Sequence, residues 1–79
     1  MEIIIYSKDN CPNCLKTQNI LLKYNPIVLK IGQDISREKF LAKFPNAKEV
    51  PQVLVNGEHI GGFADVEKWF AFNNPQEDF

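Results

Sequence analysis

This sequence is poor in the side chains from which metal and hydrolase sites are built. Its 79 residues include two cysteines, one histidine and one methionine. Two cysteines exclude a four-cysteine zinc site, although Cys11, Cys14 and His59 together would supply three ligands. We find no glycine-rich phosphate loop, no Ser/His/Asp set and no pair of carboxylates spaced for hydrolysis. These absences leave the two cysteines as the main candidates for chemistry.

Long apolar runs and an excess of charge of one sign are also missing. No run approaches the ~20 residues of a transmembrane helix, and nine basic against ten acidic residues give a net charge of −1. We therefore expect no membrane span and no strong attraction to nucleic acid or to a membrane surface. Residues 2–6 lack the pattern of a signal peptide. Together with a reactive-looking cysteine pair, this favours a reducing cytoplasm.

The two cysteines form the motif Cys11-Pro12-Asn13-Cys14, between an apolar run and a predicted helix. Pro12 suits the first position of a helix. The Cys11 sulfur should then face unpaired backbone N–H groups and the positive end of the helix dipole. Both favour the thiolate, so we expect the pKa of Cys11 to lie below the ~8.5 of a free cysteine. Cys14 follows one turn later, so the pair can cycle between dithiol and disulfide.

The rest of the chain predicts the order β-α-β-α-β-β-α in one domain, residues 1–79. We expect strands at 2–6, 27–31, 52–55 and 58–60, helices at 12–24, 37–44 and from about 65, and a frayed tail at 73–79. A right-handed crossover makes the first two strands parallel. Asn56-Gly57 predicts a tight hairpin between the last two.

The spacing of apolar residues and the candidate N-caps predict where the helices begin and which faces they bury. The seven-residue spacing of Cys14 with Leu21, and of Leu15 with Leu22, predicts an apolar stripe on the first helix. The second helix should begin after Ser36 as its N-cap and carry an apolar face formed by Phe40, Leu41 and Phe44. The third should begin at Asp65 as its N-cap.

Three further segments follow the cysteine pair in an informative order. They are Val50-Pro51-Gln52-Val53, the Asn56-Gly57 turn, and the run from His59 through Gly61-Gly62 to Asp65. In order and spacing they resemble the glutaredoxins over nearly the whole chain, in particular the short dithiol glutaredoxins of bacteria and their phages. The resemblance implies an α/β thioredoxin fold, with a four-stranded mixed sheet flanked by three helices. It also implies thiol–disulfide exchange with glutathione as co-substrate and no metal.

The resemblance assigns roles at matching positions. It implies that Cys11 is the nucleophile, that Cys14 is the resolving cysteine, and that the two form a redox-active disulfide. Pro51 matches the cis proline of the family, which places the Val50 backbone against the cysteinyl part of glutathione. Lys8 matches a basic position that pairs with the glycyl carboxylate.

The last motif implies the other end of the glutathione site. Backbone N–H groups of Phe63 and Ala64 would hold the γ-glutamyl carboxylate at a helix start, and Asp65 would bind the γ-glutamyl amine. Two positions depart from the family. Asn13 stands where many members have Tyr, and Glu49 stands where Thr is common. We expect the Glu49 side chain to point to solvent, because an inward carboxylate would oppose an anionic ligand.

The predicted function is glutathione-dependent reduction of protein disulfides and of glutathione mixed disulfides. Ribonucleotide reductase is the protein partner that the resemblance implies, and we expect a monomer in the cytoplasm, or in the host cytoplasm for a phage protein. One alternative is a thioredoxin-like reductant served by a flavoprotein reductase. Others are an iron–sulfur or zinc module and a non-catalytic interaction domain.

Overall fold

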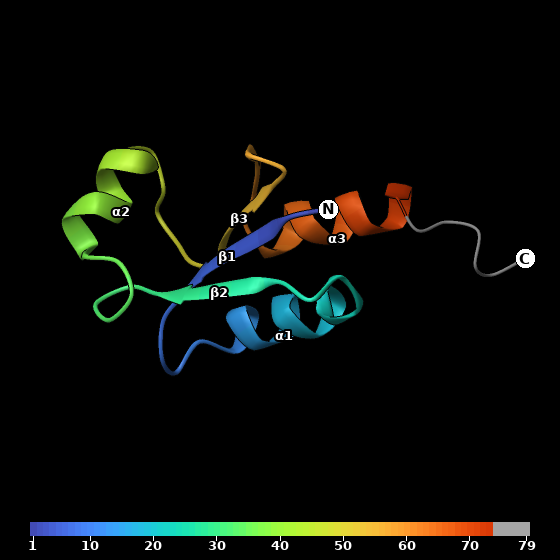
Figure 1. Ribbon diagram of the computed structural model, residues 1–79, viewed down its shortest axis with the longest axis horizontal. Coiled ribbons are helices and arrows are strands. Elements are labelled where there is room, and N and C mark those ends of the chain that lie inside the picture. The colour runs from blue at the N-terminus through green and yellow to red at the C-terminus, as the bar shows by residue number, and fades with distance from the viewer. Residues whose placement is uncertain (74–79) are drawn as a thin grey trace, which may run out of the picture.

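The computed structural model describes residues 1–73 as strands and helices in the predicted order. The elements are β1 (Ile3–Ser7), α1 (Pro12–Ile20), the short 3₁₀ helix η1 (Leu22–Tyr24), β2 (Ile27–Lys30), α2 (Arg37–Lys43), β3 (Gln52–Val55), β4 (Glu58–Gly61) and α3 (Phe63–Asn73) (Figure 1). The tail expected at 73–79 lies outside the described residues, except for Asn73, which ends α3. No helix within residues 1–73 has the length and apolar composition to cross a bilayer.

The four strands form one mixed sheet in the order β2-β1-β3-β4. β1 runs parallel to β2, as the crossover through α1 requires. β1 is antiparallel to β3, and β3 to β4. The β3–β4 hairpin turns at Asn56 and Gly57, whose φ angles of 51° and 86° are those of the predicted tight turn. The predicted four-stranded mixed sheet is therefore confirmed.

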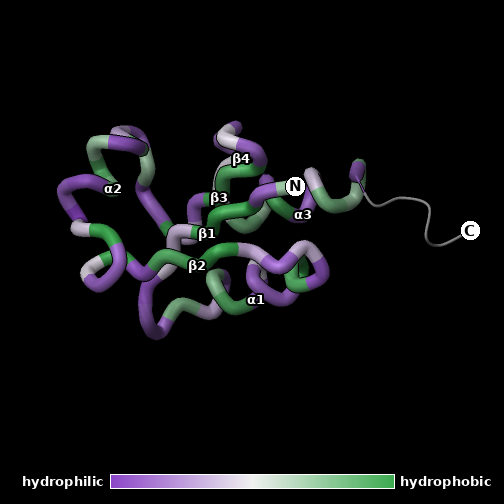
Figure 2. Tube along the Cα trace, in the orientation of Figure 1, coloured by the Kyte–Doolittle hydropathy of each residue, from purple (hydrophilic) through white to green (hydrophobic). Residues whose placement is uncertain are grey.

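Alternating side chains of the strands build a core on each face of the sheet. Ile3 and Ile5 of β1 face α1 and α3, in a cluster of Ile3, Ile5, Leu21, Val53, Val55 and Val66. Tyr6 faces the other way, in a cluster of Tyr6, Phe40, Phe44 and Leu54. Burial raises the pKa of the Tyr6 phenol. In Figure 1, α2 accordingly lies apart from α1 and α3, and Figure 2 shows the apolar strands between them.

The first helix is shorter than predicted. Of the two predicted apolar pairs, Cys14 with Leu21 is buried, but Leu15 with Leu22 is exposed. α1 ends at Ile20, and the chain continues as η1. Leu21 is fully buried, whereas Leu15 and Leu22 are 62% and 67% exposed. The buried face is formed by Cys14, Thr17 and Leu21, and a one-residue step of about 100° turns Leu15 and Leu22 to solvent.

The third helix begins earlier than predicted. Its first residue is Phe63, and the Gly62 carbonyl accepts the first helical hydrogen bond, from Val66 N–H (3.0 Å). Asp65 is therefore not the N-cap. It lies inside the first turn, where its Oδ2 accepts a hydrogen bond from Gly62 N–H (3.3 Å). This reach back to the helix start is the acidic half of a capping box.

The second helix agrees with prediction to within one residue. α2 spans Arg37–Lys43, and Ser36 is its N-cap, because the Ser36 Oγ accepts from Lys39 N–H (3.1 Å). Phe40 and Phe44 are buried in the second core, but Leu41 is 40% exposed at its edge. The predicted apolar face is thus confirmed for the two phenylalanines only.

The revised stripe on α1 can be tested with two leucines that are neighbours in sequence. We expect Leu21→Ala to lower the free energy of unfolding by about 2–5 kcal/mol, because it leaves a cavity in the core. Leu22→Ala, the matched control, should change it by less than about 0.5 kcal/mol, because that side chain is exposed. Urea denaturation followed by circular dichroism measures both. Equal losses in the two variants would contradict the burial of Leu21 alone.

Candidate active site

Cys11 lies where the chain leaves β1 and enters α1. Asn10, with φ 57°, turns the chain, and Cys11 follows in extended conformation as the N-cap residue. Pro12 is the first residue of the helix, as predicted. The Cys11 Sγ accepts a hydrogen bond from Cys14 N–H (3.2 Å). One backbone N–H of the helix start is therefore already directed at this sulfur, an arrangement that stabilises a thiolate.

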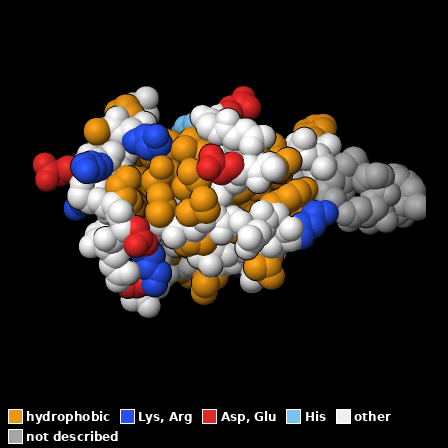
Figure 3. Space-filling view, in the orientation of Figure 1, with side chains coloured by type: hydrophobic (Ala, Val, Ile, Leu, Met, Phe, Trp, Pro, Cys, Tyr) orange, Lys and Arg blue, Asp and Glu red, His pale blue; other side chains and the backbone are white. Residues whose placement is uncertain are grey.

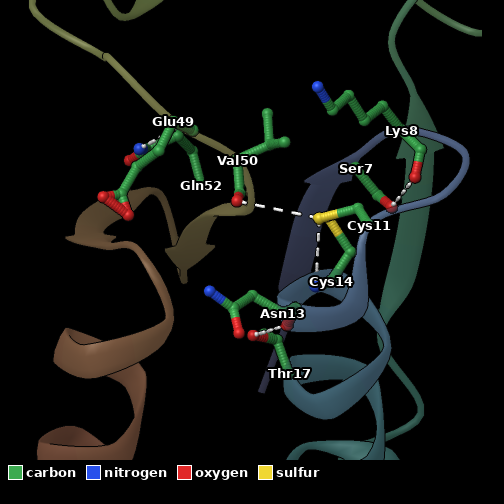
Figure 4. The surroundings of a disulfide bond; sticks show 9 residues. All are labelled: Ser7, Lys8, Cys11, Asn13, Cys14, Thr17, Glu49, Val50 and Gln52. Carbon is green, nitrogen blue, oxygen red and sulfur yellow. Dashed lines mark hydrogen bonds between the residues drawn. A yellow bond between two sulfur atoms is a disulfide. The ribbon is translucent and has the colours of Figure 1, made fainter.

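Cys11 and Cys14 are joined by a disulfide in this structure (Figure 4). Cys14 is 1% exposed and lies in the first turn of α1, whereas Cys11 is 9% exposed. An incoming thiol or disulfide therefore has better access to Cys11. The arrangement suits Cys11 for attack on an external sulfur and Cys14 for the internal exchange that follows.

The segment before β3 brings a second backbone against the cysteines. The Val50–Pro51 peptide bond is cis, as the resemblance implies. The Val50 carbonyl oxygen lies 3.8 Å from the Cys11 Sγ, although the two residues are 39 positions apart (Figure 4). A substrate bound to Cys11 would therefore have the Val50 backbone beside it.

A groove of about 410 Å³ opens next to Val50. Its lining residues are Lys8, Ile31, Arg37, Phe40, Leu41, Ala47, Lys48, Glu49 and Val50. Three of these side chains are cationic, one is anionic and the other five are apolar. Figure 3 shows hydrophobic side chains gathered beside α2 on the viewed face, with both basic and acidic side chains around them. Such a groove suits an anionic ligand with an apolar middle.

Asp65 does not line this groove. It lines a neighbouring hollow of about 390 Å³, formed by Lys43, Phe44, Pro45, Asn46, Ala47, Lys48, Glu49, Gln52, His59, Gly61 and Asp65. The two hollows share Ala47, Lys48 and Glu49. The structure thus places Lys8 and Val50 in the groove and Asp65 in the neighbouring hollow, and the three shared residues form a common wall between the two. Arg37 lines the same groove as Lys8 and adds a second cationic side chain to it.

Comparison with known proteins decides the family. The family model described as Glutaredoxin matches residues 3–60 of this chain. The chain belongs to the glutaredoxin family.

Relatives of known sequence agree. Glutaredoxin 1 of Rickettsia prowazekii is 36% identical over 69 residues, which cover 81% of this chain and 72% of that one. Hybrid peroxiredoxin hyPrx5 of Haemophilus influenzae is 38% identical over 74 residues. That match covers 89% of this chain but only 30% of the hybrid protein, so this chain corresponds to less than a third of it.

Solved structures share the fold. Reduced Escherichia coli glutaredoxin superposes with a TM-score of 0.76 at 25% identity, covering 94% of this chain and 98% of that one. A buckwheat glutaredoxin–glutathione complex gives a TM-score of 0.70 at 19% identity, covering 91% and 68%. The predicted thioredoxin fold is confirmed. Family and cysteine pair together support thiol–disulfide oxidoreductase activity.

Glu49, the acidic residue that departs from the glutaredoxin pattern, is exposed to solvent and also lies near the start of α3. Its Oε1 lies 3.5 Å from where a Cβ on Gly62 would be. Its carboxylate is thus at the start of α3, and Figure 4 shows it on that side of the loop. The expectation that Glu49 is exposed to solvent is confirmed, and the structure adds that its carboxylate lies near Gly62. A negative charge therefore lies near Gly62, the residue before the first residue of α3.

Sequence reasoning missed two polar residues that shape this glutaredoxin's site. Thr17 is fully buried, and its Oγ1 donates to the Asn13 carbonyl (2.7 Å), which ties the first turn of α1 to the second. Gln52 is buried, and its Nε2 donates to the Glu49 carbonyl (3.0 Å). Thr17 and Gln52 each lie on an otherwise apolar face, and a polar residue at such a position predicts a buried hydrogen bond.

The three-ligand metal site considered from sequence has no geometric support. The His59 ring nitrogen Nε2 lies 2.7 Å from the Gln52 Oε1 rather than near the cysteines. Within residues 1–73, no three side chains of His, Cys, Asp or Glu are grouped so as to hold a metal ion.

The different settings of the cysteines predict different reactivities. We expect Cys14→Ser, which leaves Cys11, to be alkylated by iodoacetamide at least about tenfold faster than Cys11→Ser, which leaves Cys14. The reason is that Cys11 combines access with the helix start. Mass spectrometry of timed samples at neutral pH measures both rates, and the same variants in urea serve as controls whose rates should converge. A faster reaction at Cys14 in the folded protein would overturn the assignment of the nucleophile.

Proposed function

We propose that this protein is a glutathione-dependent thiol–disulfide oxidoreductase that reduces glutathione mixed disulfides and protein disulfides. The observation that carries the proposal is the position of the Cys11 sulfur. It lies at the start of α1, 3.8 Å from the carbonyl of Val50, and Val50 lines a groove that contains three cationic side chains. Family membership supplies independent support.

The charges around the two hollows suit glutathione, which carries two carboxylates and one ammonium group. We assign the glycyl carboxylate to Lys8, with Arg37 on the same groove, and the cysteinyl backbone to Val50 beside the cis Pro51. A tripeptide extended across the common wall would reach the neighbouring hollow. There the N–H groups of Phe63 and Ala64 would meet the γ-glutamyl carboxylate, and Asp65 its ammonium. The buckwheat protein, solved as a glutathione complex, has the same fold.

The proposed reaction with a glutathione mixed disulfide has two exchanges. The Cys11 thiolate attacks the glutathionyl sulfur, a Cys11–glutathione disulfide forms, and the substrate leaves as a thiolate that takes up a proton. A second glutathione, as thiolate, attacks the glutathionyl sulfur of that adduct. Glutathione disulfide forms and the Cys11 thiolate is restored. Thiolate fraction and intrinsic nucleophilicity oppose each other, so the setting of Cys11 matters for both steps.

With a protein disulfide, the second cysteine takes part. Cys11 attacks the substrate, and Cys14 then displaces it from the mixed disulfide, which leaves the Cys11–Cys14 disulfide. Two glutathiones reduce that bond. We propose ribonucleotide reductase as a protein substrate and a single-domain monomer acting in the cytoplasm.

An assay coupled to glutathione reductase and NADPH tests the proposal. Wild type should turn over a glutathione mixed disulfide. Cys11→Ser should have no activity above the uncatalysed rate, because the attacking sulfur is gone. Cys14→Ser should keep activity on the mixed disulfide but lose most of it on a protein disulfide, because the internal thiol that displaces the substrate is gone.

Three results would contradict the proposal. The first is full activity of Cys11→Ser. The second is turnover supported by thioredoxin reductase and not by glutathione, which would select a thioredoxin-like reductant. The third is an iron–sulfur or zinc content of the purified protein together with absence of turnover, which would select a metal-binding module.

Glu49 gives the binding proposal a test based on charge. We expect Glu49→Gln to lower KM for a glutathionylated peptide about two- to fivefold, because it removes a carboxylate near the proposed γ-glutamyl carboxylate. The difference should shrink at high salt. Glu58→Gln, at the far end of β4, is the matched control and should leave KM unchanged. A higher KM in Glu49→Gln would instead assign Glu49 to the ammonium group.

A further inference from the structure

The geometry points to a positioning relay in which His59 holds Gln52, and Gln52 holds the peptide group between Glu49 and Val50. The relay sets the direction of the Val50 N–H, which an extended substrate would pair with. This inference rests on the proposed function, because it concerns the backbone assigned to the cysteinyl part of glutathione.

The central residue of the relay is Gln52, the first residue of β3, which is only 6% exposed. A buried amide needs partners for both of its ends. Its Nε2 donates to the Glu49 carbonyl (3.0 Å), so its Oε1 is the end that faces His59 Nε2 (2.7 Å). An amide oxygen only accepts, and His59 Nε2 must therefore carry the hydrogen.

The other end of the relay, His59, contacts the second core through its ring. His59 lies on β4, paired with Leu54 of β3. Its ring is 4.6 Å from the ring of Phe44, measured between centroids. Phe44 is buried at the end of α2, with its ring 5.2 Å from that of Tyr6. His59 itself is exposed, and its ring contacts the second core through Phe44 on the side from which it reaches Gln52.

The effect on Val50 follows from the planarity of the peptide group. Glu49 C=O and Val50 N–H belong to one peptide group, and within residues 1–73 only the next one, Val50–Pro51, is cis. In a trans peptide group the two bonds point in opposite directions. Because Gln52 holds the Glu49 C=O, the Val50 N–H must point away from Gln52. Val50 lines the cationic groove, and its own carbonyl is next to the Cys11 Sγ.

Paired variants separate the relay from simple packing. His59→Leu removes the donor but keeps an apolar contact with Phe44, and His59→Gln keeps a side-chain N–H. Gln52→Met keeps the length of the side chain and loses both hydrogen bonds. We expect His59→Leu and Gln52→Met to raise KM for a glutathionylated peptide about two- to tenfold, the range for loss of one hydrogen bond, with kcat unchanged within about twofold. His59→Gln should stay within about twofold of wild type.

The double variant tests whether the two residues act in series. His59→Leu combined with Gln52→Met should raise KM no further than Gln52→Met alone. Urea denaturation of each variant gives the stability change separately, and the KM changes should not follow it. Unchanged KM in both single variants, or additive changes in the double variant, would overturn the relay.

A second readout does not depend on glutathione. In ¹⁵N-correlated NMR spectra of the oxidised protein, His59→Leu should shift the Val50 amide and the Gln52 side-chain amide signals, and His59→Gln should leave both near their wild-type positions. Absence of those shifts in His59→Leu overturns the relay. Absence of glutathione turnover in wild type, with the shifts present, overturns the proposed function and leaves the relay standing as a property of the loop.

Discussion

The antiparallel pairing of β1 with β3 is the constraint on which the site depends. Tyr6 pairs with Gln52 at one end of the sheet, so the end of β1 and the start of β3 lie side by side. The chain leaves β1 toward Cys11 and enters β3 from Val50, and the two loops must meet. β2 ends at the same edge because it is parallel to β1, and α3 begins there because β4 is antiparallel to β3.

Three kinds of backbone group therefore converge on a small volume. The start of α1 directs the Cys14 N–H at the Cys11 sulfur, and the Val50 carbonyl approaches the same sulfur from the other side. The start of α3 is close by, with the Glu49 carboxylate beside it. Helix starts favour negative charge. In this protein the start of α1 faces the Cys11 sulfur, and the Glu49 carboxylate lies near the start of α3.

Short sequence patterns were enough to predict where two of the helices begin and where the hairpin turns. Pro12 after Cys11 identified the helix start, Asn56-Gly57 identified the hairpin, and Ser36 identified the start of α2. These features depend on a few neighbouring residues and their backbone preferences. The errors arose where packing decides. Spacing alone did not show that Leu21 is buried and Leu22 exposed. Asp65 was predicted as the N-cap of α3, but it lies in the first turn and accepts a hydrogen bond from Gly62 N–H.

The amino-acid sequence by itself determined the order of elements, the cysteine pair at a helix start and the likeness to glutaredoxins, because these rest on short motifs and on the order of those motifs along the chain. Only the tertiary structure decided that Lys8 and Asp65 line neighbouring hollows, that Glu49 turns toward α3, and that His59 bonds to Gln52. Each of these contacts joins residues from different elements. Their geometry depends on sheet register and side-chain packing, which a linear pattern does not specify.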